Sequence, residues 1–528
     1  MNAEIVEVPT ASPPHRACSQ LEVPGLGDDT ISRLVLGLDE QPVLLSAEAA
    51  AAELNDAFAV RLLRAGVFPN TAGEVLHALE QVDPGGPLSR HSFFLVGEGS
   101  QLSADVDAQR NMRFLVTCGL GPQGPAVVVS SFHPDQGMVE AMAWDDLIGG
   151  FNFYRTMPDS NAWVFAGNSR HALTGPTRGH GPFESHLNGN IVMKELKDPW
   201  VNWDSPKAQV PASSLAAQGL DTHPWVLRLD PGGGYALEDL AVRPAITRWS
   251  AARVAAIVAE TATETPGRML EQLLGTSTVN LHSSHTSSAS AVGGSSPQVD
   301  LPSTFFVDAD SFALVGLPGP PNRLQVSRSI YAQALVDFDV RLDDGGGFTQ
   351  PGDTHFAFVV PERAFEDVAT IGEALRAGLL TSRLVAALLM VDFPNPVFSP
   401  KREALTTHLA GVPWTGDGAT YSEAVAEAIL TSAQAGVEGT AESEFAARWA
   451  VGEAFVDAFS GELAGFYAQL DATLATADGF AAVYELAEWR RSRVKEMPIF
   501  ESQLLFSTCN ISPSPRRMTA AATVEEMA

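Results

Sequence analysis

The sequence predicts an α+β protein, with antiparallel β-meanders followed by a largely helical C-terminal region. Short runs rich in Val, Phe and Trp, divided by Gly-Pro or Pro-Asp turns, fill residues 112–167. Apolar residues recur at three- and four-residue spacings through much of residues 362–495, with acidic side chains on the remaining face. The chain has 528 residues, enough for several domains of roughly 100 to 200 residues each.

The first 110 residues are expected to be an arm followed by a helical region. Residues 1–30 are rich in Pro, Ser and acids, which is typical of a flexible arm. Residues 46–66 repeat apolar side chains near the helical period, and Thr71 can cap a second helix that continues to Leu79. We therefore expect residues 31–110 to be mainly helical and structural.

A β-meander domain is expected over residues 111–298. Its first turn, GLGPQG at residues 119–124, has the glycine spacing of a dinucleotide-binding loop, but Pro125 leads into a strand-like run instead of a helix. The glycines therefore predict a hairpin. The strands are expected at residues 112–118, 126–132, 138–144, 150–155, 161–167 and 224–229. Helices are expected at residues 249–260 and 269–274, and a Ser/Gly-rich linker at residues 282–298.

Residues 299–528 are expected to contain strands followed by a helical region. The strands are predicted at residues 304–307, 334–342 and 354–360, and the helices at residues 362–389, 422–435, 443–475 and 479–495. An internal similarity suggests two pseudo-related halves. WSAARV at residues 249–254 resembles WRRSRV at residues 489–494, each copy is followed by a QLL run, and a triple glycine follows both Asp230 and Asp343.

Composition narrows the function classes. The net charge of −30 argues against non-specific binding to nucleic acid or to an anionic membrane, because such binding depends on clustered Lys and Arg. The three cysteines lie far apart, which favours a reducing compartment. The N-terminus lacks a secretory pattern, and the most apolar window, residues 378–391, is shorter than the ~20 residues of a membrane span. We expect a soluble, cytoplasmic protein.

The best candidate for a site is residues 179–208, which concentrate His, Lys, Trp and Asn. Residues 170–207 hold slightly more Lys and Arg than acids, so this stretch is locally basic within an acidic chain. Such a cluster can receive a carboxylate or phosphate, or can form ordinary ion pairs. The candidates for anion or substrate binding are Arg178, Lys194, Trp200 and Trp203. The tryptophans, with Trp163 and Trp225, can also be core residues.

Histidines supply the candidate proton carriers. His186 precedes a short helix predicted at residues 191–197, where the helix dipole disfavours the imidazolium and leaves a neutral ring. The candidate catalytic residues are His186, His180 and Glu195. An ordinary loop histidine would look the same. No metal ligands are assigned, because the chain has no HExxH, CxxC or EF-hand pattern and His282 and His285 lie in a Ser-rich stretch. Ser169 fails the GxSxG pattern of a nucleophile elbow.

Residues 182–193, PFESHLNGNIVM, resemble a c-type haem attachment segment in which Pro182 and Ser185 stand where the two cysteines would be. The missing cysteines exclude covalent attachment. The resemblance then implies His186 as an axial ligand of a non-covalent haem, with Met193 as a second ligand.

These observations favour an enzyme that acts on a small organic substrate, with an anionic group as one option, using a histidine base in the 179–208 segment. Two alternatives stay open: a non-enzymatic binding or scaffold protein, and an oxidoreductase with non-covalent haem or a histidine-bound metal. The reaction, the cofactor and the oligomeric state are unknown at this stage.

Overall fold

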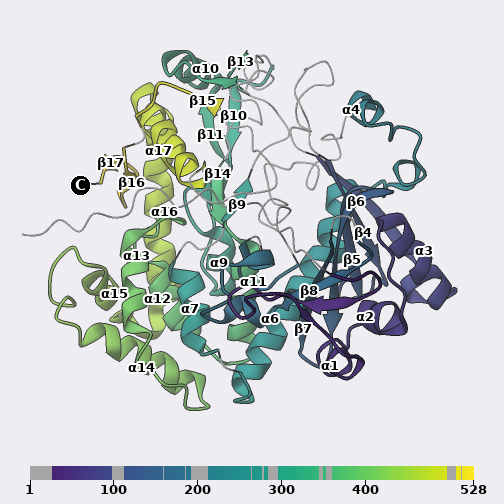
Figure 1. Ribbon diagram of the computed structural model, residues 1–528. Helices are drawn as coiled ribbons and strands as arrows, with labels where there is room; N and C mark the ends of the chain where they lie inside the picture. The colour runs from purple at the N-terminus through teal and green to yellow at the C-terminus, as the bar shows by residue number, and fades with distance from the viewer. Residues whose placement is uncertain are drawn as a thin grey trace, which may run out of the picture.

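The computed structural model describes residues 26–97, 112–157, 160–184, 186–191, 212–262, 264–275, 279–282, 295–343, 349–352, 360–495, 507–512 and 514–527. An eight-stranded, mostly antiparallel sheet forms the N-terminal part, and the C-terminal part is largely helical (Figure 1). The predicted α+β class is confirmed.

The sheet has the order β2-β1-β8-β7-β6-β5-β4-β3, and only the β1–β8 pair is parallel. Its central strands are β4 Met112–Cys118, β5 Val127–His133, β6 Gln136–Asp145, β7 Gly150–Thr156 and β8 Trp163–Asn168. These five confirm the predicted meander within a few residues at each end. Three more strands lie in the region expected to be mainly helical: β1 Ile31–Arg33, β2 Val43–Leu44 and β3 His91–Gly97.

Helices α1 Ala47–Glu53, α2 Ala57–Arg61 and α3 Ala72–Val82 cover one face of the sheet (Figure 1). The helical pattern of residues 46–66 is interrupted because Asp56 caps α2 through a hydrogen bond from the Ala59 amide, 2.9 Å long. Phe58 of α2 packs edge-on against Trp163 of β8, at 5.0 Å between ring centroids. Trp163 and Trp225 are both buried in this core, so for them the structural interpretation holds.

Thr71 caps α3 as predicted, since its hydroxyl accepts a hydrogen bond of 3.2 Å from the Glu74 amide. Replacing Thr71 with alanine should lower the free energy of unfolding by about 1 kcal/mol, because that amide loses its acceptor. Thr71→Ser keeps the hydroxyl and should lose less than half as much. Urea unfolding followed by circular dichroism measures both. Equal losses for the two variants would mean that the cap is not the cause.

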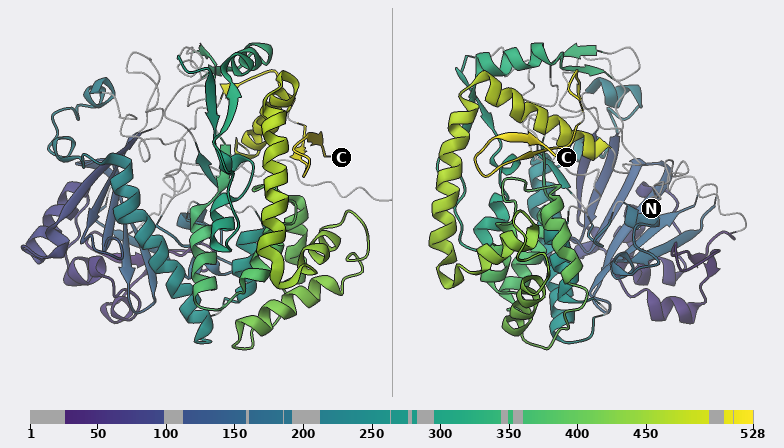
Figure 2. Two further views of the ribbon diagram at one scale, coloured as in Figure 1. Left: turned by 180° about the vertical axis from the view of Figure 1, so that it is seen from behind. Right: turned by 90° about the vertical axis from the view of Figure 1, so that its left-hand side faces the viewer.

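The other face of the sheet, called here the inner face, packs against α6 Arg243–Val258 (Figure 2). The glycine-rich hairpin between β4 and β5 meets this helix. Gly124 has a φ of +89°, and a Cβ on it would lie 3.0 Å from the Ala245 amide nitrogen and 3.1 Å from the Ala241 carbonyl oxygen. The predicted hairpin at residues 119–124 is therefore confirmed. Glycine is needed at residue 124 because the helix approaches its backbone closely.

The helix α6 belongs to two cores. Ile246 and Trp249 pack on the inner face of the sheet, while Val254 and Ile257 join the core of the helical region. The sequence predicted residues 249–260 as helical, and the structure extends this helix toward the N-terminus through α5 Gly233–Leu237 and a π-helical turn.

Two predicted strands are wrong, and a third is wrong over most of its length. Residues 224–229 form a short helix, η7 Val226–Arg228, and residues 304–307 overlap η9 Ser303–Phe305. The last two of residues 334–342 belong to β12 Arg341–Asp343, but the first four belong to α10 Arg328–Asp337. There the alternation of apolar residues with aspartates resembles a strand, but Tyr331, Ala334 and Leu335 are buried at helical spacing while Val336 faces solvent.

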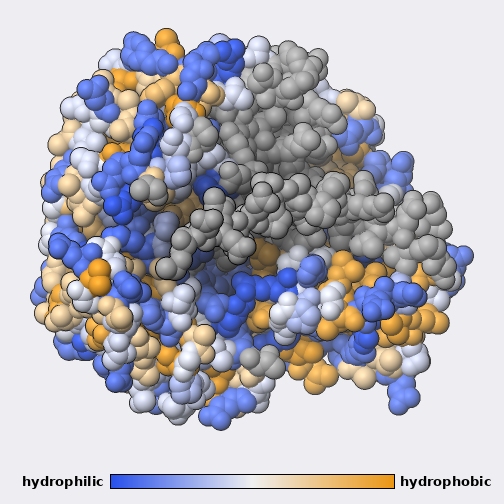
Figure 3. All heavy atoms as spheres, turned by 60° about the vertical axis from the view of Figure 1, so that its left-hand side comes forward, coloured by the Kyte–Doolittle hydropathy of each residue, from blue (hydrophilic) through white to orange (hydrophobic). Residues whose placement is uncertain are grey.

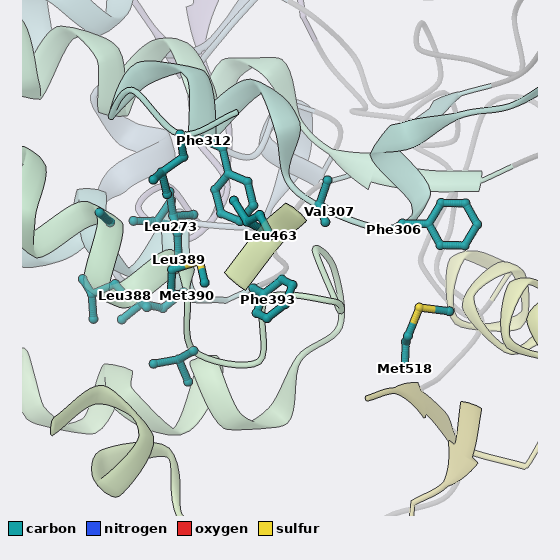
Figure 4. Close-up of a cluster of buried hydrophobic side chains, with 14 of the residues drawn as sticks. Leu273, Phe306, Val307, Phe312, Leu388, Leu389, Met390, Phe393, Leu463 and Met518 are labelled. Atoms are coloured by element: carbon teal, nitrogen blue, oxygen red, sulfur yellow. The ribbon is translucent and has the colours of Figure 1, made fainter. Parts of the chain in front are cut away.

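The helical region is built around a large apolar core (Figure 4). Phe312, Leu388 and Phe393 are among its buried side chains. Its helices are α7 Pro266–Leu274, α9 Ala309–Leu314, α10, α11 Phe365–Arg376, α12 Ser382–Leu389, α13 Pro400–Ala404, α14 Gly418–Leu430, α15 Ala441–Trp449, α16 Phe455–Leu474 and α17 Ala477–Lys495.

The predicted helices of this region are confirmed, with two of them divided. Residues 362–389 form α11 and α12, separated by Gly378 at a φ of +68°, and residues 443–475 form α15 and α16, separated by Gly452 at +69°. Short strands complete the region: β9 Val279–His282, β10 Gln298–Leu301, β11 Leu324–Ser327, β12 Arg341–Asp343, β13 Thr349–Pro351, β14 Val360–Arg363, β15 Ser507–Thr508, β16 Arg516–Met518 and β17 Val524–Glu526.

Some predictions fall partly or wholly outside the described residues. These are the arm at residues 1–30 up to residue 25, the linker between residues 283 and 294, and the strand at 354–360 up to residue 359. The duplication stays a prediction, because the second triple glycine and the second QLL run also lie outside the described residues. The first triple glycine leads into α5 and does not join two strands.

Figure 3 shows one face of the molecule, where hydrophilic and hydrophobic side chains are intermixed. None of the helices in the described ranges could cross a membrane.

Candidate functional site

The predicted site residues fall into three groups. Glu195, Lys194, Trp200, Trp203 and Met193 lie outside the described residues. His180 and Arg178 are exposed, whereas His186 is buried. The two histidines therefore have different surroundings: His180 faces solvent, and His186 is enclosed by the fold.

Arg178 lies beside α7. Partial burial of its guanidinium, followed by the nearby positive charge of Arg268, lowers the pKa of Arg178, while the carboxylate of Glu271 raises it. Arg178 is thus placed at the junction between the segment after β8 and the helical region.

A tight loop at residues 186–191, called here the site loop, carries His186. The His186 amide donates to the Pro182 carbonyl at 2.9 Å, and the Gly189 amide donates to the His186 carbonyl at 2.8 Å. Gly189 has a φ of +74°, and a Cβ on it would lie 2.5 Å from the Ser169 carbonyl oxygen. Only glycine fits this close approach.

Ser169 fixes the site loop to the sheet. Its hydroxyl donates to the Gly189 carbonyl at 2.6 Å and accepts from the Phe151 amide at 2.8 Å. Because both hydrogen-bonding functions of this buried hydroxyl are used by the backbone, Ser169 has a structural role.

The site loop contacts the sheet, α6 and α11. The indole Nε1 of Trp249 on α6 donates to the Asn188 carbonyl at 2.7 Å. The side-chain amide of Asn188 in turn donates to the Glu366 carboxylate on α11 at 3.2 Å. The backbone of the site loop is therefore fixed by groups from both parts of the molecule.

The His186 ring has a defined orientation. Its Nδ1 lies 2.8 Å from the Asn190 carbonyl oxygen, and its ring packs on Phe153 of β7 with 4.9 Å between centroids. A carbonyl oxygen only accepts, so Nδ1 carries the proton of the neutral ring and Nε2 carries the lone pair. This is the tautomer in which Nε2 can accept a proton or bind a metal ion.

Asn190 is the most unusual polar residue of the loop. Its side chain is 1% exposed, and both its amide nitrogen and its amide oxygen have no hydrogen-bond partner in the part of the chain that the structure describes. Buried polar groups are nearly always hydrogen-bonded, so an amide with two unpartnered atoms points to a missing partner.

A row of polar side chains crosses the inner face beside His186. Ser130 on β5 pairs in register with Glu140 on β6, and Glu140 pairs with Arg155 on β7. Arg155 lies two residues after Phe153 and therefore on the same face of β7. Arg113 on β4 points to this face as well, and Ser130, Arg155 and Arg113 are all buried.

The polar row was not predicted, although the sequence carries a signal for it. Most other inward positions of β4 to β7 are apolar, as Leu115, Val128, Met142 and Phe153 show. A charged residue at an inward strand position is rarer and more informative than a loop histidine. Finding it from sequence requires the register of four strands, which fixes which charges are neighbours.

Two other members of the basic stretch have structural partners. The Arg170 guanidinium lies 4.8 Å from the Trp249 ring centroid and donates to the Ile148 and Gly149 carbonyls. The Nδ1 of His171 accepts from the Asn168 amide at 3.0 Å, and burial lowers the pKa of this ring. For Arg170 the ordinary structural interpretation is therefore sufficient.

No group of three or more His, Cys, Asp or Glu side chains suited to a metal ion occurs within the described ranges. The His282 side chain and the whole of His285 lie outside what the structure describes. Comparison of the chain with models of protein families, with curated proteins and with solved structures gives no match. The fold class and the site geometry are thus what defines this protein.

Proposed function

We propose that the protein is an enzyme that acts on a small organic molecule carrying an anionic group, with His186 as the proton acceptor. The observation that carries this proposal is the orientation of the His186 ring, whose Nδ1 lies 2.8 Å from the Asn190 carbonyl oxygen. A buried imidazole held in this way keeps its Nε2 pointing in one direction, which a general base requires.

The polar row supports an anionic substrate. Arg113 and Arg155 are buried on the face on which His186 packs, and Glu140 lies opposite Arg155 in register. Interactions between charges are stronger in a buried environment than in water, and arginine can bind a carboxylate or phosphate through two parallel hydrogen bonds. In this proposal the two buried arginines take the role predicted for Arg178. Lys194, Trp200, Trp203 and Glu195 stay predictions.

The test distinguishes the roles of the two ring nitrogens of His186. His186→Asn places an amide nitrogen near the position of Nδ1, so it keeps a donor for the Asn190 carbonyl while it removes Nε2. A panel of small carboxylates and phosphates is first screened for compounds that raise the melting temperature and are consumed by the wild-type protein, as followed by NMR. His186→Asn should still bind such a compound but convert it at least ~100-fold more slowly.

The matched control is His180→Asn, which changes an exposed histidine six residues away. It should convert the same compound at the wild-type rate. A His186→Asn protein as fast as the wild type would rule out His186 as the base. If the wild-type protein consumes no compound of the panel, the proposal of an enzyme for this substrate class is wrong.

The orientation of His186 also favours a second candidate, a histidine-bound metal or haem, because ligand histidines usually donate their other ring nitrogen to a carbonyl or carboxylate. This candidate predicts a haem absorption band, or a metal content near one per chain by elemental analysis. Either signal should be lost in His186→Asn and kept in His180→Asn. Protein that has neither signal after purification and after incubation with haem or Zn²⁺ would exclude it.

A further inference from the structure

The side-chain amide of Asn190 is buried with both of its polar atoms unpartnered among the described residues. The neighbouring amide in the same loop behaves differently, because Asn188 donates to Glu366 at 3.2 Å. The fold thus satisfies one buried amide of the site loop and leaves the other without a partner. Such a group destabilises the folded protein unless something else binds it.

We propose that Asn190 determines substrate specificity by pairing with an amide group of the substrate. This inference rests on the proposed function, since it assigns the substrate class of the same site. A carboxamide offers an N–H donor and a carbonyl acceptor side by side, and a second amide can satisfy both at once through two parallel hydrogen bonds. A carboxylate would satisfy only the donor, and an ammonium group only the acceptor.

The surroundings of Asn190 complete the substrate class. Its carbonyl orients His186, and the ring of His186 packs on Phe153, two residues from the buried Arg155. The proposed function already assigns an anionic group to the substrate, so an amide partner for Asn190 defines a small carboxylate that carries an amide group. A site built to hydrogen-bond such a group rejects analogues that lack it, because its own polar atoms are then left unpaired.

The first experiment needs no ligand. Asn190→Leu replaces the amide by an apolar side chain of similar size, so the substitution should raise the melting temperature by about 1–3 °C. Asn188→Leu is the matched control: it removes an amide that does have a partner and should lower the melting temperature. A fall in melting temperature for Asn190→Leu as large as that for Asn188→Leu would overturn the inference. It would mean that the Asn190 amide already has hydrogen-bond partners within the fold.

The second experiment uses two matched probes, succinamate and succinate, which differ in that an amide replaces one carboxylate. At about 10 mM, succinamate should raise the melting temperature of the wild-type protein by about 1–3 °C and that of Asn190→Leu by much less. Succinate should have little effect on either protein. Equal shifts with both probes, equal shifts in both proteins, or no shift with succinamate would each overturn the inference.

The two proposals fail separately. His186→Asn keeps Asn190 and should therefore respond to succinamate as the wild type does. If it also converts substrate at the wild-type rate, the proposed base is wrong while the amide recognition stands. If turnover depends on His186 but wild-type and Asn190→Leu proteins bind succinamate equally, the base stands and the amide recognition is wrong.

Discussion

Replacing Arg490 with leucine should lower the free energy of unfolding by about 3–5 kcal/mol. Arg490 lies on α17 and is fully buried, and its guanidinium donates to the Phe305 carbonyl, the Pro394 carbonyl and the Asn395 side-chain oxygen. Burial lowers the pKa of Arg490 to about 9, so the charge is held in the interior against a large desolvation cost. Leucine would leave the buried Phe305 and Pro394 carbonyls without this donor, and the Asn395 side-chain oxygen would keep only the hydrogen bond from the Met518 amide.

Arg323 provides the control for this substitution. Its side chain is 81% exposed and forms an ion pair with Asp300 at 2.9 Å. Because exposed ion pairs contribute little, Arg323→Leu should change the stability by less than about 1 kcal/mol. Urea unfolding followed by circular dichroism gives both values. An Arg490→Leu protein as stable as Arg323→Leu would show that the acceptors around Arg490 find other donors.

The stability difference between the wild-type protein and Asp56→Asn should fall by about 3 kcal/mol between pH 3.5 and pH 7.5. Asp56 is buried and accepts hydrogen bonds from the Tyr154 hydroxyl and from the Asn152 amide at 2.8 Å. Burial raises the pKa of Asp56 to about 6 from its ordinary value of 3.8. Between these two pKa values, the folded protein therefore keeps a proton on Asp56 that the unfolded chain has released.

The direction of this pH dependence follows from the proton bound to Asp56. A carboxyl group whose pKa is raised by folding contributes its stabilisation fully below pH 3.8 and loses it as the pH rises through about 6. Asparagine is neutral throughout, so the variant lacks this loss. Urea unfolding of both proteins at several pH values measures the difference.

The stability difference between the wild-type protein and Asp417→Asn should change with pH in the opposite direction. Asp417 caps α14 in solvent, where hydrogen bonds from Thr420 lower the pKa of its carboxyl group. Its stabilising contribution is therefore present above its ordinary pKa and is lost as the pH falls. A wild-type to Asp56→Asn difference that is flat with pH would mean that Asp56 titrates normally in the folded protein.

The sequence predicts the central sheet well and its edges poorly. Strands β4 to β8 alternate or cluster Val, Phe and Trp between Gly-Pro and Pro-Asp turns, and these local signals survive in the fold. Strands β1 and β2 are only three and two residues long, so they have no period to detect. In addition, β1 joins the sheet by pairing with β8, which lies more than a hundred residues later in the chain.

For the candidate site, sequence reasoning finds the segment and misses the partners. The composition of residues 179–208 singles out His186, which is buried and oriented. The sequence predicts a neutral ring from a helix that follows His186, and residues 192–197 of that helix lie outside the described residues. The orientation comes instead from the Asn190 carbonyl, a backbone group that composition does not reveal. Arg155 and Glu140 become neighbours only through strand register.

The helix α6 links the site loop to the helical core. Trp249, near the middle of this helix, donates to the Asn188 carbonyl of the site loop, and Val254 and Ile257, nearer its C-terminal end, are part of the helical core. Asn188 also donates to Glu366 of the adjoining α11. A change in the angle between the helical region and the sheet would therefore also change the contacts that hold the loop carrying His186.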